Sequence, residues 1–423
     1  MSLAEKITAQ GCGCDAVEGH SGLISVEEAL ARIAAVATPV SGGQAVPLSE
    51  AAGRVLAEPV VALGPTPPFD NAAMDGYAIS SAALLGEGPW ALRVTGRVAA
   101  GHVAPDSLSR QGAIQVFTGA PVPSGADAVV MQEEVLRAGA QIVLRRKIPM
   151  GENIRRAGED MRAGDVILPA GRRLGGREIA ACAAAGHGHV FVVRPVRIAL
   201  LVTGDEVCAA GQSRSGAQIW DVNSPMLAAE IASPAVELIG PYVAADTREG
   251  LRGQLKALVE QADLIVTTGG ISVGEEDHVK PALADLGAEI VFSGVALKPG
   301  KPVSFGKVQE TYWLGLPGNP LSAFMTWQHL GTALCKALSG RRGAAPAGRL
   351  AVLSQALRHK PGRSEMRLAR TVGYDGLGRE SIDCAEATHS GRVAALSGMD
   401  GYIIIPAEAE GLPANAPVEF YPF

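Results

Sequence analysis

The chain has 423 residues, more than one hydrophobic core usually organises, and this length predicts three or four domains. Its composition (47% hydrophobic, 4% aromatic, 52 glycines, 27 prolines) favours an α/β protein with many tight turns and small β-rich modules. The net charge of -6 argues against nucleic acid or an anionic membrane surface as a partner. No apolar run approaches the roughly 20 residues that span a bilayer, and no secretory pattern opens the chain, so we expect a cytoplasmic protein.

The N-terminal part of the chain combines helices with a β-rich module. Ser25 and Glu28 open a run of apolar residues at helical spacing, which predicts a capped helix. Short apolar runs broken by glycine and proline then predict a β-rich domain over residues 57–160. An alanine-rich segment at residues 176–186 predicts a return to helix.

The central part of the chain alternates regularly between strand and helix patterns. Buried-strand runs such as RIALLVTG and DLIVTTGG are each followed by an amphipathic segment, and the series closes with one helix over LSAFMTWQHLGTALCKALSG. Such alternation predicts a doubly wound, mainly parallel α/β domain over residues 191–340.

The two ends of the chain lie outside this pattern. We expect residues 1–21 to be a disordered tail, because Cys12 and Cys14 cannot fill a zinc site alone and no CxxC or HxxxH partner occurs elsewhere. At the other end, a linker precedes a short all-β module over residues 347–423.

Four polar, Gly/Pro-rich loops follow strands of the predicted sheet. In an open α/β sheet, ligands bind beyond the carboxyl ends of the strands, so we expect these loops to converge on one site. Each loop alone also fits an ordinary turn, and together they predict a site for a phosphate-bearing ligand without specifying a reaction. The loops are TGDE (203–206), TTGGISVGEEDH (267–278), LKPGKP (297–302) and GLPGNP (315–320).

The charged residues of these loops divide into two sets. Glycine-rich turns let backbone N–H groups approach an anion, and Lys298 and Lys301 add positive charge. Carboxylates do not bind anions directly, so they predict a hard cation such as Mg²⁺ between the protein and phosphate oxygens. These carboxylates are Asp205, Glu206, Asp246 and Asp277.

Seven motifs resemble one known family. They are FDNAAMDGYA, FTGAPVPSGADAVVMQEE, RRAGEDMRAGD, TGDE, TTGGISVGEEDH, LKPGKP and GLPGNP, in this order between about residues 22 and 406. Together they resemble the MoeA family of molybdopterin molybdenumtransferases, which is also called the gephyrin E-domain family.

The resemblance implies an elongated, multi-domain homodimer. Residues 22–56 and 161–190 would form its dimerisation domain. The central α/β domain would resemble molybdopterin adenylyltransferase, and residues 347–423 would form a β-barrel-like domain.

The resemblance also implies an activity. Molybdate would be inserted into adenylyl-molybdopterin with Mg²⁺ as cofactor, giving molybdenum cofactor and AMP, and other cofactor-synthesis enzymes would be further partners. Two alternatives stay open: a molybdopterin adenylyltransferase that uses MgATP, and a gephyrin-like scaffold. The β-rich modules argue against the first alternative, and the lack of a long linker and of a fused second catalytic domain argues against the second.

The resemblance assigns roles residue by residue. Catalytic roles fall on Glu206, Asp277, Lys298, Lys301 and Asp246, of which Asp277 and Glu206 would also bind the metal. Substrate binding falls on Asp70, Asp75, Thr118, Asp160, Thr203, Gly204, Asp205, Asp221, Asn223, Gly269, Gly270, Ser272, Pro317, Pro320, Arg367 and Ser390.

The chain departs from the family pattern at one position and aligns ambiguously at others. Some members carry a basic residue four positions before Lys298, where this chain has Gly294, so one anion contact is replaced or lost. Arg370 is an alternative to Arg367, and the position of Ser390 is also ambiguous.

Overall fold

The fold is taken from a computed structural model, which describes residues 22–103, 107–271, 277–343, 346–385, 391 and 393–423. The chain divides into two compact units. The β unit comprises residues 45–52 and 58–192, and the α/β unit comprises the remaining residues. The predicted tail with Cys12 and Cys14, and the predicted site residues Ser272 and Ser390, lie outside the described residues.

The β unit is built around a six-stranded sheet with the strand order β7-β4-β6-β5-β9-β8. Strands β5 and β6 are parallel, and the other neighbours are antiparallel. Alternate apolar residues such as Ile79, Val130 and Ile142 fill its core. Helix α2 (Gly176–Ala184) lies in the same unit. The strands are β4 (Gly76–Ile79), β5 (Trp90–Val98), β6 (Gly112–Val116), β7 (Ala128–Met131), β8 (Leu136–Ala138) and β9 (Gln141–Leu144).

The α/β unit contains the sheet that positions the site, with the strand order β16-β13-β17-β21-β20-β18. Its first four strands are parallel, and β20 and β18 add an antiparallel edge, which confirms a mainly parallel sheet. The strands are β13 (Val196–Thr203), β16 (Val236–Ala244), β17 (Leu264–Thr268), β18 (Glu289–Ser293), β20 (Ser304–Val308) and β21 (Thr311–Leu316).

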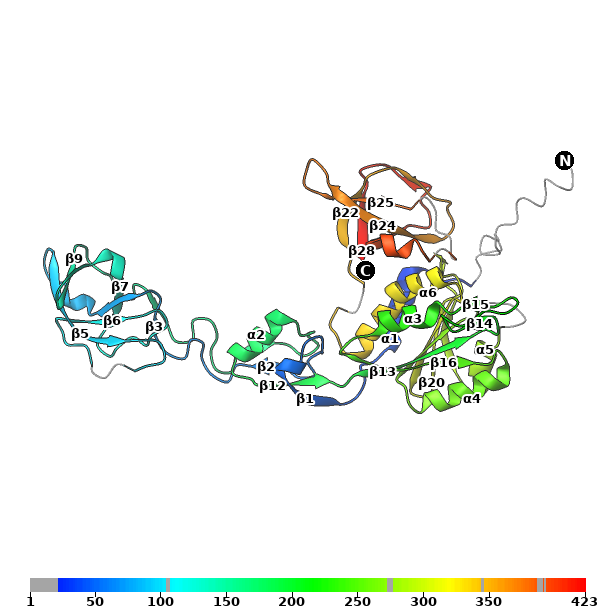
Figure 1. Cartoon of the computed structure of the whole chain (residues 1–423), viewed down its shortest axis with the longest axis horizontal. Helices are drawn as coiled ribbons and strands as arrows, with labels where there is room; N and C mark the ends of the chain where they lie inside the picture. The colour runs from blue at the N-terminus through cyan, green and yellow to red at the C-terminus, as the bar shows by residue number, and fades with distance from the viewer. Residues whose placement is uncertain (1–21, 104–106, 272–276, 344–345, 386–390, 392) are drawn as a thin grey trace. The chain divides into compact units, whose positions relative to one another are not determined.

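Helices cover both faces of this sheet (Figure 1). Strand β13 is apolar throughout because its alternate residues face opposite layers. Ile198 and Leu200 join the core cluster that contains helices α1, α3 and α6, whereas Ala199 and Leu201 join the cluster with α4 and α5. The helices are α1 (Val26–Val36), α3 (Asn223–Ile231), α4 (Arg248–Val259), α5 (Val279–Asp285) and α6 (Pro320–Thr326).

The α1 helix begins after Ser25 as predicted, and the Ser25 hydroxyl accepts a hydrogen bond from the Glu28 N–H at 3.1 Å. Two features of these helices were not visible in the sequence. The first is that α1 packs against the α/β sheet. The last helix is interrupted by a π-helical turn (Trp327–Gly331) between α6 and α7 (Thr332–Leu338). Gly331 leaves room there for the Trp327 ring, which is 2% exposed.

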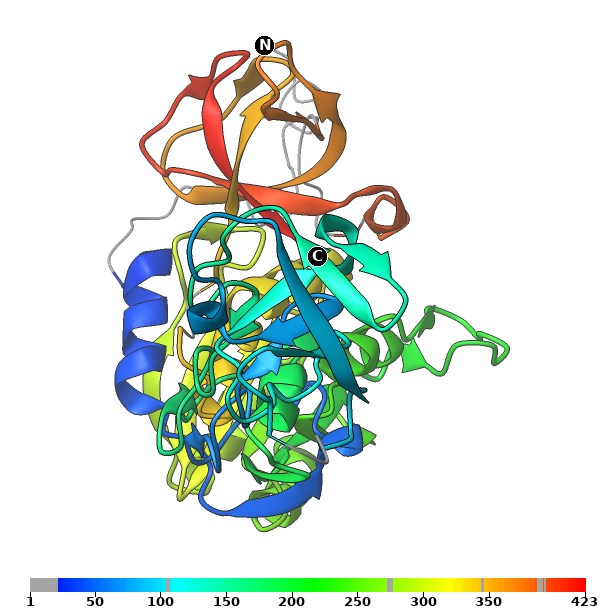
Figure 2. The same ribbon diagram turned by 90° about the vertical axis from the view of Figure 1, so that its left-hand side faces the viewer.

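The C-terminal part of the α/β unit is a closed β-barrel, which confirms the predicted barrel-like module (Figure 2). Strand β24 pairs with both β25 and β26, and this double pairing closes the circuit β24-β25-β22-β28-β26. A short strand, β19 (Leu297–Lys298), also pairs with β24. The barrel strands are β22 (Arg349–Leu353), β24 (Ser364–Tyr374), β25 (Glu380–Cys384), β26 (Gly401–Ile405) and β28 (Pro417–Pro422).

No helix in the described part of the chain is long and apolar enough to cross a membrane.

Candidate active site

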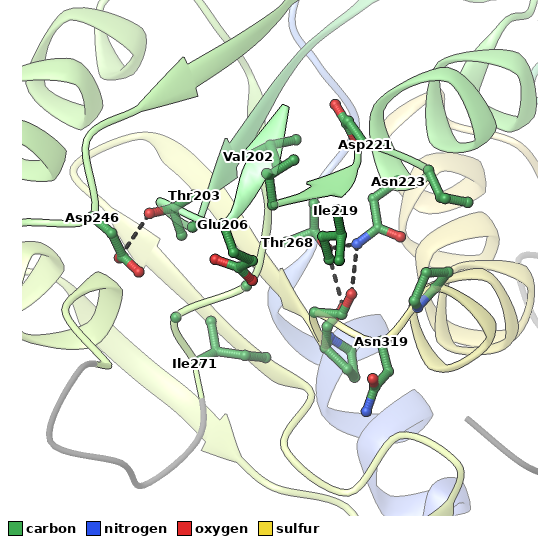
Figure 3. A pocket seen from close by; sticks show the side chains of 18 of the residues that line it. Val202, Thr203, Glu206, Ile219, Asp221, Asn223, Asp246, Thr268, Ile271 and Asn319 are labelled. Atoms are coloured by element: carbon green, nitrogen blue, oxygen red, sulfur yellow. Dashed lines mark hydrogen bonds between the residues drawn. The ribbon is translucent and has the colours of Figure 1, made fainter. Parts of the chain in front are cut away.

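A pocket of about 370 Å³ opens where strands β13, β17 and β21 end (Figure 3). Its walls come from all four loops that the sequence singled out, together with the residues around β15 and the start of α3; the LKPGKP loop contributes only Pro302. The predicted site residues that line it are Thr203, Gly204, Glu206, Asp221, Asn223, Asp246, Gly269, Gly270, Asp277, Pro317 and Pro320.

The side chain of Asn223 joins three segments of the pocket wall. Its amide nitrogen donates to the Thr268 hydroxyl and to the Gly318 carbonyl, both at 2.8 Å, and Thr268 donates onward to the Pro317 carbonyl at 3.0 Å (Figure 3). Asn223 is 8% exposed and Thr268 is 1% exposed. These buried hydrogen bonds hold α3, the end of β17 and the loop after β21 in register.

Asp246 and the turn after β17 form a second fixed part of the wall. The Thr203 hydroxyl donates to the Asp246 carboxylate at 2.8 Å. Gly269 has a φ of +92°, and a Cβ there would lie 2.6 Å from the Thr203 carbonyl oxygen. Only glycine therefore allows this turn to lie against β13.

Glu206 lies on an exposed segment that leaves β13. This segment carries two short parallel strands, β14 (Val207–Cys208) and β15 (Ile219–Trp220), and the Ile219 N–H donates to the Glu206 carbonyl at 2.8 Å. Asp205, on the same segment, accepts a long 3.4 Å hydrogen bond from the Asp246 N–H and is not among the described lining residues.

The pocket lining is acidic. Its ionisable side chains among the described residues are all carboxylates, namely those of Glu206, Asp221, Asp246 and Asp277. Near Asp277, burial lowers the pKa of Lys280 and the Asp277 carboxylate counteracts that shift. The sequence interpretation had overlooked Lys280, which lies in the first turn of α5, three residues after Asp277.

The predicted lysines lie beside the pocket. Lys298 and Lys301 are absent from the described lining, although Pro302 of the same loop belongs to it. Gly294, the position at which we expected some relatives to carry a basic residue, has a φ of +95°, and a Cβ there would lie 2.7 Å from the Leu23 side chain. The local backbone therefore explains why this chain has glycine at that position.

The β unit holds four other predicted residues. Hydrogen bonds from the Ala157 N–H (2.8 Å) and the Arg156 guanidinium (2.6 Å) lower the pKa of Asp70. The N–H and hydroxyl of Thr118 both donate to Asp75 at 2.8 Å, and these bonds lower the pKa of Asp75. Asp160 and Thr118 are exposed. The described pocket lining contains none of these four residues.

The barrel arginines already have partners. Arg367 is 5% exposed, and its guanidinium donates to Glu365 at 3.1 Å and to the Arg358 carbonyl at 2.7 Å. The alternative residue, Arg370, is exposed and forms a 3.4 Å ion pair with Asp383.

The sequence interpretation also missed Trp220, which lines the pocket and is 47% exposed. A tryptophan normally indicates core packing, so only its place one residue before Asp221 pointed to the site.

Comparison with known proteins accounts for most of the chain. The MoeA N-terminal region (domain I and II) matches residues 24–186, a probable molybdopterin binding domain matches 199–336, and the MoeA C-terminal region (domain IV) matches 351–423.

Relatives of known sequence and structure agree with this match. The molybdopterin molybdenumtransferase of Haemophilus influenzae is 36% identical over 296 residues, which cover 70% of this chain and 72% of that protein. The enzyme of the same name from Staphylococcus epidermidis is 30% identical and covers 93% and 94%. A crystal structure of the molybdopterin biosynthesis MoeA protein from Pyrococcus horikoshii superposes with a TM-score of 0.81 at 28% identity, covering 95% of this chain and all of that one. The chain therefore belongs to the MoeA family of molybdopterin molybdenumtransferases.

Proposed function

We propose that the chain inserts molybdate into adenylyl-molybdopterin and releases AMP, as a molybdopterin molybdenumtransferase. The observation that carries the proposal is the pocket at the strand ends of the domain that matches a probable molybdopterin binding domain. The family regions on both sides of that domain do not favour a stand-alone adenylyltransferase or a scaffold.

The reaction brings like charges together. Molybdate is a dianion and the nucleotide-linked pterin carries a pyrophosphate, so the site must offset their repulsion. Lys298 and Lys301 lie in the loop that contributes Pro302 to the pocket wall, and they would supply positive charge at its edge. Asp246, which lines the pocket and is oriented by the Thr203 hydroxyl, would hold the substrate in position.

The donor set fits Mg²⁺ bound jointly by protein and substrate. Mg²⁺ usually takes one or two carboxylates together with waters and phosphate oxygens. Glu206 and Asp277 line the same pocket, and within the described ranges no three His, Cys, Asp or Glu residues gather into a complete cage. When bound, the ion would neutralise the pyrophosphate and improve AMP as a leaving group.

The proposal extends to assembly. In a cytoplasmic homodimer, Asp70, Asp75, Thr118 and Asp160 would be offered to the pocket of the second copy. Light scattering should then give a particle of twice the 43.4 kDa chain mass. A monomer at working concentration would contradict this part of the proposal.

The test of the activity is AMP release from adenylyl-molybdopterin with Mg²⁺, in the presence and absence of molybdate. We expect molybdate-dependent release that is lost in Asp277→Ala and kept in Glu249→Ala, because Glu249 is an exposed acid on α4 outside the pocket lining. AMP release at the same rate with and without molybdate would refute the transferase assignment. Adenylylation of molybdopterin with consumption of MgATP would also refute it.

A further inference from the structure

The Glu206 carboxylate lies directly over the backbone of Gly204. A Cβ on Gly204 would be 2.6 Å from Oε2 of Glu206 and 3.1 Å from both its Cδ and its Oε1, whereas ordinary van der Waals contact begins at 3.4 Å. The carboxylate therefore occupies space that a side chain at position 204 would fill. Both residues line the pocket, and Figure 3 shows the Glu206 side chain in its wall.

The backbone brings Glu206 back over Gly204. The Val207 N–H donates to the Gly204 carbonyl at 3.0 Å, which closes a turn with Glu206 as its third residue. From the other side, the Ile219 N–H donates to the Glu206 carbonyl at 2.8 Å. Gly204 has a φ of +136°, a conformation that residues with a side chain rarely adopt. The same glycine thus permits the turn and leaves room for the carboxylate.

The two neighbouring pocket acids are placed in different ways. Asp246 accepts a 2.8 Å hydrogen bond from the Thr203 hydroxyl. Within the described ranges, by contrast, no hydrogen bond or ion pair reaches the Glu206 carboxylate. The position of that carboxylate is therefore set by the turn and by the open space over Gly204.

We propose that Gly204 is a positioning residue, which keeps the Glu206 carboxylate at the end of strand β13. A Cβ at position 204 would make the nearest carboxylate oxygen move by about 0.8 Å. A displacement of about 1 Å in a reacting group can lower a rate roughly 100-fold. The inference rests on the proposed function, since it takes Glu206 to act in AMP release.

The kinetic experiment is a double-mutant cycle of wild type, Gly204→Ala, Glu206→Gln and the variant with both changes. In the wild-type background, Gly204→Ala should lower kcat/KM for molybdate-dependent AMP release roughly 10- to 100-fold. In the Glu206→Gln background it should change kcat/KM less than about 3-fold, because the charge that it displaces is already gone. The same loss in both backgrounds would overturn the inference, as would unchanged turnover in Gly204→Ala.

Gly211→Ala is the matched control for backbone strain. Gly211 lies on the same exposed segment with a φ of +88°, and nothing lies within 4 Å of its Cβ position. Both alanine variants should lower the melting temperature, because both strain the backbone. Only Gly204→Ala should lower kcat/KM. An equal loss of activity in Gly211→Ala would assign the effect to strain and contradict the inference.

Crystal structures of wild type and Gly204→Ala provide a readout that does not depend on activity. The nearest oxygen of the Glu206 carboxylate should move by about 0.8 Å or more, while the turn keeps its hydrogen bond between Val207 and residue 204. An unmoved carboxylate would overturn the inference even if wild type releases AMP, and the proposed function would then stand alone. A displaced carboxylate in a protein whose wild type releases no AMP would support the steric role of Gly204 and refute the proposed function.

Discussion

The Asn223 amide donates to the Thr268 hydroxyl at 2.8 Å, and this bond ties helix α3 to the end of strand β17 under the pocket. Both side chains are buried, and Thr268 passes the connection to the Pro317 carbonyl. The positions of the two loops that follow β17 and β21 therefore depend on the Asn223 amide.

Replacing Asn223 by alanine should destabilise the protein and impair the site together. The change leaves Gly318 and Thr268 each without a buried donor, which costs about 1–3 kcal/mol. Urea unfolding should show this loss, and KM for the pterin substrate should rise. Gln261→Ala removes an exposed side-chain hydrogen bond and should cost less than about 0.5 kcal/mol. Similar losses in the two variants would contradict the proposed role of Asn223.

Glu206→Gln keeps the shape of the side chain but removes its charge. Glu206 is exposed, so the melting temperature should not change, while kcat/KM for AMP release should fall roughly 100-fold or more. Rescue at high Mg²⁺ concentration would assign Glu206 to metal binding, and no rescue would favour proton transfer. Unchanged turnover would show that the carboxylate has no part in the reaction. Glu249→Gln is the matched control.

Placing a basic residue at position 294 by Gly294→Lys should destabilise the chain. The positive φ and the close approach of Leu23 together cost about 1–3 kcal/mol. Gly253→Lys is the matched control, because Gly253 lies in helix α4 with nothing near its Cβ position, and it should be neutral or stabilising by up to about 1 kcal/mol. A gain in stability for Gly294→Lys would refute the backbone explanation.

His329 should make stability depend on pH. Burial lowers its pKa from 6.5 to about 4, and its Nδ1 lies 2.9 Å from the Tyr402 hydroxyl. A lowered folded-state pKa means that the unfolded chain takes up the proton first, so this stabilising contribution is complete above pH 6.5 and is lost as the pH falls toward 4. The urea midpoint of wild type should fall over that interval more than that of His329→Gln. Parallel curves would contradict this assignment.

The sequence predicted the regular parts of the fold because their patterns are local. The unbroken apolar run of β13 indicated a strand buried on both faces, and the structure confirms it. Ser25 and Glu28 likewise marked the start of α1. The apolar stripe of α1 indicated that one face is buried, but it could not indicate that the burying partner is a sheet more than 150 residues away. The π-helical turn depends on the fit of Trp327 against Gly331, which periodicity does not encode.

The sequence predicted those site residues that directly follow a parallel strand of the sheet. Asp246 and Gly269 follow strands whose carboxyl ends meet, so the strand-end rule brings them to one pocket. The rule was less successful for Lys298 and Lys301, which are absent from the described pocket lining. Their loop follows β19, a short strand that pairs with barrel strand β24 and not with the α/β sheet. Trp220 was overlooked because its exposure depends on how the 204–222 segment folds back, and no local pattern reports that.

Strand β19 pairs with barrel strand β24, with Lys298 beside Glu365 in the register of the two backbones. This pairing has a practical consequence for the design of chimeric proteins. If the barrel of a relative replaced this one from the linker near residue 346 onward, its strand β24 would not match the β19 of this chain. The mismatch would then lie at residues 297–302, far in sequence from the junction between the two proteins. A transplantable C-terminal module therefore includes residues 297–302 as well as the barrel itself.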